Sequence, residues 1–184
     1  MTIAISGNGT ITGVVAGGLP SSIITSNNII DYAVSTAKLA NSAVTSPKVG
    51  YAGAVLQVQH YVVATNYTGA SSSYVQITAF NQTFTPLYST SKVLVILSTG
   101  INLICDGMVA LTRNGSIVKD TWFGSTRTDD QFDYPQTSGF YLDSPGTTSA
   151  VTYGVQVRAT GCGNTIRIGG SDNHQSWTFM EIAA

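Results

Sequence analysis

The stretch Met108-Val-Ala-Leu-Thr-Arg-Asn-Gly-Ser-Ile-Val-Lys-Asp-Thr-Trp122 reads as two strands joined by a tight turn. Asn114-Gly115 lies at its centre, and turns of this kind need backbone φ angles above zero, which glycine adopts freely. The flanking residues 108–112 and 117–122 are mostly apolar and β-branched. The stretch therefore predicts an antiparallel β-hairpin and, with it, a sheet in this part of the chain.

Further strands are expected on both sides of this hairpin. They are short apolar or alternating segments between turn residues, at 55–63, 74–80, 82–85, 92–98, 140–142, 151–158, 165–168 and 177–182. Residues 92–98 form a near-continuous apolar run, which is typical of a strand covered on both faces. About nine short strands without a convincing long helix predict an all-β fold, an antiparallel β-sandwich or jelly roll over residues 51–184.

A ten-residue unit is repeated three times upstream of these strands, as LPSSIITSNN, IIDYAVSTAK and LANSAVTSPK over residues 19–48. A fixed period indicates that one small unit is stacked. Two apolar residues per unit are too few to be buried within one chain, so we expect them to line a shared axis of identical chains. The residues expected at this trimer interface are Leu19, Ile24, Ile29, Val34, Leu39, Val44 and Val49. A flexible Ser/Thr-rich linker with chance similarity is the alternative.

Residues 1–18 differ from both later parts. Apolar and small residues alternate here and glycines are frequent, so no long helix is expected. We predict an extended arm that lies on another protein, with anchoring side chains Ile3, Ile5, Ile11, Val14 and Val15. The expected organisation is an arm (1–18), a repeat stem (19–50) and a head (51–184).

The composition favours a permanent oligomer. Charged residues make up 9% of the chain, against roughly 25% in ordinary soluble domains, and the mean hydropathy is +0.18. So few charges would leave the surface of a monomer poorly protected against association. The net charge of −1 provides no basic patch for nucleic acid. The longest apolar run, residues 93–97, is far short of a membrane span.

Residues that could carry chemistry are few. His60 and His174 have no second metal ligand at a useful spacing, and no nucleophile or phosphate-binding motif occurs. Asp129, Asp130 and Asp133 lie close together, but a hard cation needs six or more oxygens, so a solvated loop is the simpler interpretation. We therefore expect no enzymatic activity and no cofactor, while ion binding by this loop stays open.

One segment has the composition of a binding site. Residues 121–141 place aromatic side chains among carboxylates and amides, and such mixtures can hold a sugar or a partner's loop. The candidate ligand-binding residues are Trp122, Asp130, Gln131 and Tyr134. The alternative is structural, with Trp122 in the core and Tyr134 in a subunit contact.

The repeats resemble a phrase found in fibre and capsid-decoration proteins of tailed bacteriophages. That phrase, [LI]-x-[DN]-x-A-V-[ST]-x-x-K-[LV], matches IIDYAVSTAKL and LANSAVTSPKV, residues 29–39 and 39–49, whereas Asn28 departs from it in the first copy. Residues 7–13, 17–20 and 178–182 share the same style. The resemblance implies a homotrimeric jelly-roll head in a virion assembled in the host cytoplasm, without membrane insertion.

Two roles follow from this resemblance. In the first, the protein is a capsid decoration or cement protein whose arm grips the major capsid protein or another virion protein. In the second, it is a tail fibre or tail tip protein that binds a host surface glycan or receptor. The short chain without a long shaft favours decoration.

Overall fold

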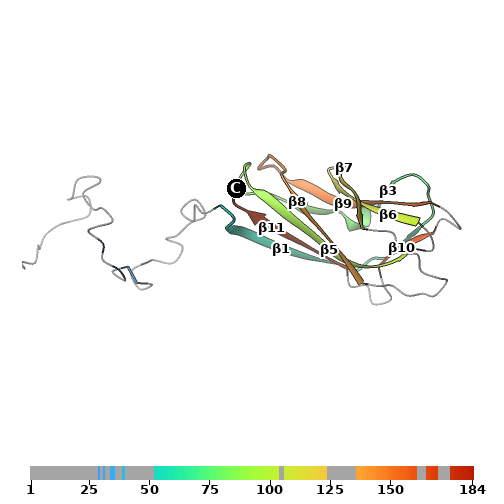
Figure 1. The fold of residues 1–184 in the computed structure, drawn as a ribbon, viewed down its shortest axis with the longest axis horizontal. Helices are drawn as coiled ribbons and strands as arrows, with labels where there is room; N and C mark the ends of the chain where they lie inside the picture. Colours follow the sequence, from blue (N-terminus) through green and yellow to red (C-terminus); the bar gives the residue numbers. More distant parts are fainter. Residues whose placement is uncertain are drawn as a thin grey trace, which may run out of the picture. The chain divides into compact units, whose positions relative to one another are not determined.

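The computed structural model describes residues 52–103, 106–123, 136–160, 165–169 and 175–184, together with Ile29, Asp31, Val34, Ser35 and Leu39. The chain divides into two units, Met1–Lys48 and Val49–Ala184. We call the second unit the head; its strands run from teal to red in Figure 1. The expected arm and nearly all of the expected stem lie outside the described residues.

The head is an all-β sandwich of two antiparallel sheets, as predicted. The first sheet has the order β1-β11-β5-β10-β2, with β8 on the other side of β5. Its strands are β1 (Val55–Val63), β2 (Tyr67–Gly69), β5 (Lys92–Leu103), β8 (Gln136–Asp143), β10 (Ile166–Ile168) and β11 (Gln175–Ile182). Figure 1 shows β11 between β1 and β5. Because β10 and β11 both pair with β5, they behave as one interrupted strand.

The second sheet has the order β3-β9-β6-β7, with β4 also paired to β9. Its strands are β3 (Val75–Gln76), β4 (Gln82–Phe84), β6 (Asp106–Arg113), β7 (Ser116–Phe123) and β9 (Val151–Thr160). When β2 is counted with β1, β3 with β4 and β10 with β11, sequence-distant strands are neighbours in both sheets. This order is compatible with a jelly roll.

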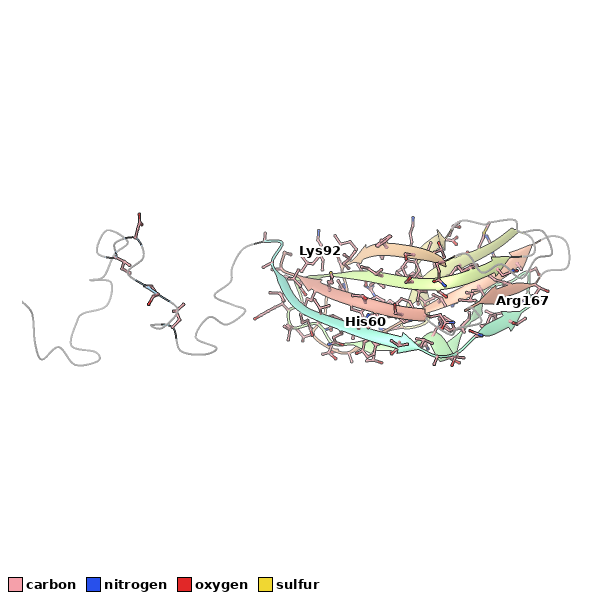
Figure 2. All side chains as sticks on the ribbon, turned by 90° about the horizontal axis from the view of Figure 1, so that it is seen from below. His60, Lys92 and Arg167 are labelled. Atoms are coloured by element: carbon pink, nitrogen blue, oxygen red, sulfur yellow. The ribbon has the colours of Figure 1, made fainter. Side chains whose placement is uncertain are left out.

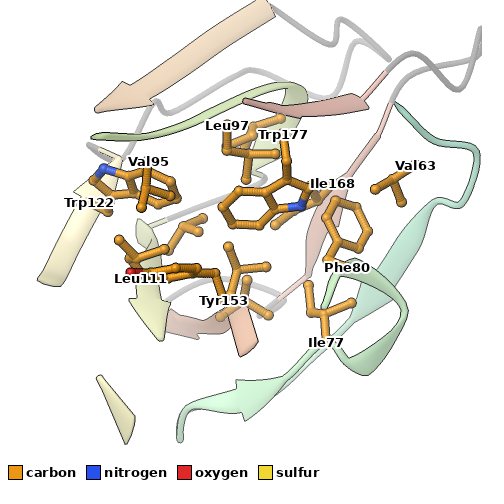
Figure 3. Packing of buried hydrophobic residues seen from close by; sticks show 14 of the residues in the cluster. Val63, Ile77, Phe80, Val95, Leu97, Leu111, Trp122, Tyr153, Ile168 and Trp177 are labelled. Atoms are coloured by element: carbon orange, nitrogen blue, oxygen red, sulfur yellow. The ribbon is translucent and has the colours of Figure 1, made fainter. Parts of the chain in front are cut away.

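The aromatic ring of Phe179 on β11 is completely buried and contacts rings from both sheets. Two of its partners, Trp177 and Tyr153, are labelled in Figure 3. The centroid of the Phe179 ring is 5.3 Å from that of Tyr153 on β9, 5.5 Å from Phe84 on β4 and 5.7 Å from Trp177. Trp122 on β7 stacks on Trp177 at 5.9 Å. Aromatic side chains bury large areas and gain further from such ring contacts, so this cluster is the centre of the core.

The predicted hairpin is confirmed. Asn114 and Gly115 have φ angles of 51° and 79° and connect β6 to β7. The turn also docks on β9, since the Asn114 amide donates to the Thr152 carbonyl at 2.7 Å and the Thr152 amide to Asn114 Oδ1 at 2.8 Å. The turn residues therefore hold the end of three strands together.

Residues 74–80 differ from the prediction of one alternating strand. Only Val75–Gln76 is extended, and residues Thr78–Phe80 form a single 3₁₀ turn. Ile77 and Phe80 are both buried in the core. Three residues apart, they cannot share one face of a strand, whose side chains alternate, but they do share one side of a 3₁₀ turn. The turn therefore satisfies both side chains, and β4 continues beyond it.

Replacing Gly115 by valine tests the turn. A β-branched residue at a φ of 79° is strained, so we expect Gly115→Val to lower the free energy of unfolding of the head by roughly 1–3 kcal/mol. Thermal and urea unfolding followed by circular dichroism measure the loss. Ser116→Val adds the same side chain in the adjoining strand and should cost little. Equal stabilities of the two variants would show that the turn does not require positive φ at Gly115.

Candidate functional site

The outward surface of four strands of the first sheet forms a continuous apolar patch. The β1-β11-β5-β8 register aligns Val58, Met180, Leu94 and Leu142 in one row across the sheet. The adjacent row is His60, Thr178, Ile96 and Phe140. Side chains aligned in this way stand beside one another on one face. We call these two rows, together with Val55, Val62 and Ile182, the outer apolar face.

Much of this face is open to solvent in the single chain. Phe140 is 63% exposed, Val62 65% and Val58 53%, and Leu142 is exposed as well. The prediction that both faces of residues 92–98 are covered holds on the inner face, where Val93, Val95 and Leu97 are completely buried. On the outer face it is wrong for the described part of one chain, because Leu94 and Ile96 are only half-buried.

The outer apolar face becomes more polar along the strands. The row nearest the start of β1 aligns Val55 and Ile182 with Lys92, whereas the row at the far end aligns Val62 with three serines, Ser176, Ser98 and Ser138. Lys92, the first residue of β5, lies at one end of the sandwich, and His60 on β1 lies nearer the middle of the sheet (Figure 2). Among the residues of these rows, Lys92 and His60 are the only titratable ones; His60 Nδ1 lies 3.0 Å from Thr178 Oγ1.

Strand β1 also leaves an open edge beside this face. It pairs with β11, and the part of the chain that the structure describes provides no strand on its other side. On this side, β1 is connected to residues 83 and 85 by side-chain hydrogen bonds. Gln57 Nε2 donates to the Thr85 carbonyl at 2.9 Å, and the Tyr61 hydroxyl donates to the Thr83 carbonyl at 3.2 Å. The strand has no proline and no charged residue, the usual protections of an edge against pairing with another chain.

The outward surface of the second sheet is polar by contrast. Gln76 Nε2 donates to Asn81 Oδ1 and to the Val155 carbonyl, both at 3.0 Å. A side chain on Gly154 would come within 2.1 Å of Asn81 Oδ1, so glycine is needed for this close approach. Amides therefore cover this face and bond one another.

A charged cluster lies at the side of that polar face. The Arg158 guanidinium is 4.7 Å from the centre of the Tyr74 ring, and the Tyr74 hydroxyl donates to Asp120. Burial, followed by the Asp120 carboxylate, raises the pKa of Tyr74, and this hydrogen bond lowers the pKa of Asp120. Thr121 has a φ of 48° at a bulge in β7. Both charged groups therefore interact with Tyr74 of the same chain.

Two buried carboxylates have structural partners. Glu181 is fully buried and accepts hydrogen bonds from the Leu87 amide at 2.8 Å, the Tyr88 amide at 3.1 Å, Gln57 Nε2 at 2.6 Å and the Ser91 hydroxyl. Burial alone would raise the pKa of Glu181, but the hydrogen bonds outweigh it and hold the pKa below its usual value. Glu181 thereby fastens the segment between β4 and β5 to β11.

The second buried carboxylate joins the two sheets. Asp143 on β8 accepts from Arg113 Nη1 on β6 at 2.7 Å and from the Tyr153 hydroxyl on β9 at 2.7 Å. Burial and this hydrogen bond raise the pKa of Tyr153 far above its ordinary value. Because each member has its partners inside the head, the cluster is suited to holding the sheets together rather than to proton transfer.

The residues predicted to bind a ligand are not brought together by the described part of the structure. Trp122 is 9% exposed and packs in the core, as the structural alternative for it predicts. Asp130, Gln131 and Tyr134 lie outside the described residues, as do Asp129 and Asp133. Within the described segments, no group of three His, Cys, Asp or Glu side chains could hold a metal ion, and no helix is long and apolar enough to cross a membrane.

The residues predicted to lie in a trimer interface or to grip a capsid are mostly undescribed. Ile29, Val34 and Leu39 are 47%, 54% and 44% exposed in the single chain. The other stem residues, Leu19, Ile24, Val44 and Val49, and the arm residues Ile3, Ile5, Ile11, Val14 and Val15, lie outside the described residues. Their roles stay predictions.

The outer apolar face itself was not predicted as a site from the sequence. Its signal was present in the near-continuous apolar run at 92–98 and in Phe140 and Leu142, whose outward positions only the strand register reveals. Comparison of the sequence with protein-family models and with curated proteins finds no match.

The Glu181 network predicts a pH dependence of stability. Because the folded-state pKa of Glu181 lies below its unfolded value of about 4.5, the ionised carboxylate stabilises the fold above that pH, and this contribution is lost as the pH falls through the folded pKa. We expect Glu181→Gln to be less stable than the parent at pH 7 and to lose less free energy between pH 6 and 3. Urea unfolding at each pH measures this.

The matched control for this prediction is Asp120→Asn. The Asp120 carboxylate is exposed and its pKa is also lowered, but solvent screens its interactions. This variant should keep most of the parent's pH dependence. If Glu181→Gln and the parent lose the same free energy on acidification, Glu181 does not contribute in this way.

Proposed function

We propose that the protein is a non-enzymatic structural protein of a tailed-bacteriophage virion, a homotrimer that decorates and stabilises the capsid. The observation that carries the proposal is the union, in one chain, of the ten-residue repeat with a jelly-roll-like head. The repeat supplies the phage resemblance and a means of winding identical chains around one axis. The antiparallel sandwich supplies a folded head.

The charge pattern supports an assembled state. Charged residues are only 9% of the chain, and the two best-buried carboxylates of the head, Asp143 and Glu181, are engaged inside it. Few charges are left for solvation, which suits a protein whose surface is largely covered by copies and by a shell. The apolar residues of the arm, separated by small ones, suit a strand-like contact with the major capsid protein.

Binding of a host surface glycan by a tail fibre or tail tip protein is the second candidate. The segment that favours it is 121–141, where aromatic residues alternate with Asp130, Gln131 and other polar side chains. Aromatic faces and carboxylates are the groups that hold sugars. In this role Tyr134 would be an anchor.

Purified protein added to particles that lack it tests the decoration role. The parent should bind the particles and raise the temperature at which they release DNA. Deletion of residues 1–18 should abolish binding and leave the thermal unfolding of the head unchanged, because the arm makes the contact. Sedimentation measures binding and a DNA-intercalating dye measures release.

The opposite pattern would support the fibre role. Particles without the protein would then survive heating and fail only to adsorb to host cells. Tyr134→Ala should in that case reduce attachment about thirtyfold, the usual effect of losing an aromatic anchor of roughly 2 kcal/mol, whereas Tyr134→Phe, which keeps the ring, should retain most of it. Unchanged attachment of Tyr134→Ala is expected for a decoration protein.

A further inference from the structure

We infer that the outer apolar face of the first sheet is the surface through which three copies of this chain contact one another in the head. The inference depends on the trimer of the proposed function and adds where the subunits meet. Nothing in the repeat assigns this surface. It comes from the strand register of β1, β11, β5 and β8.

The face is large enough to form part of a subunit contact. Four strands at about 4.8 Å spacing, with rows spread over about seven residues at 3.3 Å each, cover roughly 19 Å by 23 Å in projection. Because the side chains project from the sheet, the accessible area is larger than this projected area. Patches of several hundred Å² on soluble proteins mark interaction sites, and a specific interface buries about 800 Å² per partner.

The chemistry of the face favours a copy of the same chain as its occupant. The rows contain no carboxylate, and their cationic candidates are Lys92 at the rim and His60. A charged partner therefore finds little complementarity. Interfaces that form only transiently are about as polar as the rest of a protein's surface, whereas permanent homo-oligomer interfaces are more apolar and poor in charge. The outer apolar face has the second character.

Strand β1 supplies an independent argument. Its outer edge, which none of the described strands pairs, borders the same face and carries no charge or proline. A free head would then present an apolar surface and an open strand edge side by side. Both are liabilities in a monomer. A neighbouring copy placed against this side covers them together.

The connectivity agrees with this arrangement. The chain enters β1 a few residues after the end of the first unit at Lys48. The rows nearest that entry are the apolar ones, with Val55, Ile182, Val58 and Met180, and the distant row is rich in serine. The most apolar rows of the face therefore lie at the end of the sheet where the chain enters β1.

Threefold symmetry determines which parts of the face meet. A closed ring of three needs a head-to-tail contact, in which two different surfaces of each copy come together, whereas a twofold dimer would place the same residues opposite each other. The β1 side of one copy, with Val58, therefore meets the β8 side of the next, with Phe140. Both sides are needed for the ring.

Charge substitution on each side of the face tests this inference in the full-length protein. Val58 and Phe140 are largely exposed in the single chain, so Val58→Asp and Phe140→Asp should leave the head folded. Because the repeats also hold the chains together in the proposed trimer, each variant should dissociate at a protein concentration at least tenfold higher than the parent, as measured by light scattering after size exclusion on dilution, at an unchanged circular dichroism spectrum. Ile117→Asp is the matched control, since Ile117 is also exposed but lies on the second sheet. It should dissociate at the same concentration as the parent.

A measurement on the unmodified protein covers the case in which a variant fails to fold. Met180 lies on the outer apolar face and Met108 on the second sheet, and both are half-buried in the single chain. In the trimer, peroxide should oxidise Met180 several-fold more slowly than Met108, as read by peptide mass spectrometry. Equal rates would overturn the inference.

The remaining outcomes separate this inference from the proposed function. Variants of Val58 and Phe140 that dissociate at the same concentration as the parent and still bind particles overturn the interface and leave decoration intact. Variants that dissociate at the higher concentration, combined with a parent that binds no particle, support the interface and refute decoration. A parent that is monomeric at micromolar concentration refutes the interface.

Discussion

The contact of the Phe179 ring with one ring of its own strand and two rings of the second sheet is the interaction on which the head depends. It brings Trp177 of its own strand together with Tyr153 of β9 and Phe84 of β4, at centroid distances of 5.3–5.7 Å. Because β11 lies between β1 and β5, the first sheet is centred on the same strand that anchors the second. The packing of the two sheets and the order of the strands therefore have one common origin.

The hydrogen-bond partners of the few charged side chains explain what these side chains do in the head. Arg113 and Asp143 join the sheets, Glu181 fastens a loop, and Asp120 bonds Tyr74. These ionic groups thus serve internal contacts. The outward surfaces of the two sheets therefore differ in their uncharged side chains. Amides lie on the second sheet and aliphatic side chains on the first. The polar side chains of the second sheet hydrogen-bond one another. The apolar face of the first sheet stabilises the protein only when another surface covers it.

Local signals predicted the strands well, because alternation and turn residues act over a few positions. The Asn114-Gly115 turn and the range Val55–Val63 were found correctly. Prediction failed where contacts with distant residues determine the local structure. At Thr78–Phe80, burial of two core side chains replaces a strand by a turn. The strand Tyr67–Gly69 was missed because three residues are too short to show a period. The site was harder still, since no pattern in one chain tells whether an apolar residue such as Trp122 or Phe140 faces the core or a second copy.

The pairing of β1 with β11 has a consequence for biosynthesis. Gln57 and Glu181, which bond each other across these strands, are separated by 124 residues. At ribosomal speed this separation corresponds to a delay on the order of ten seconds. During that time β1, an uncharged strand, lacks its partner β11 and is open to pairing with nascent chains on the same messenger. A cell that makes this protein in quantity must therefore keep the growing chains apart, by spacing of ribosomes or by chaperones, until β11 has emerged.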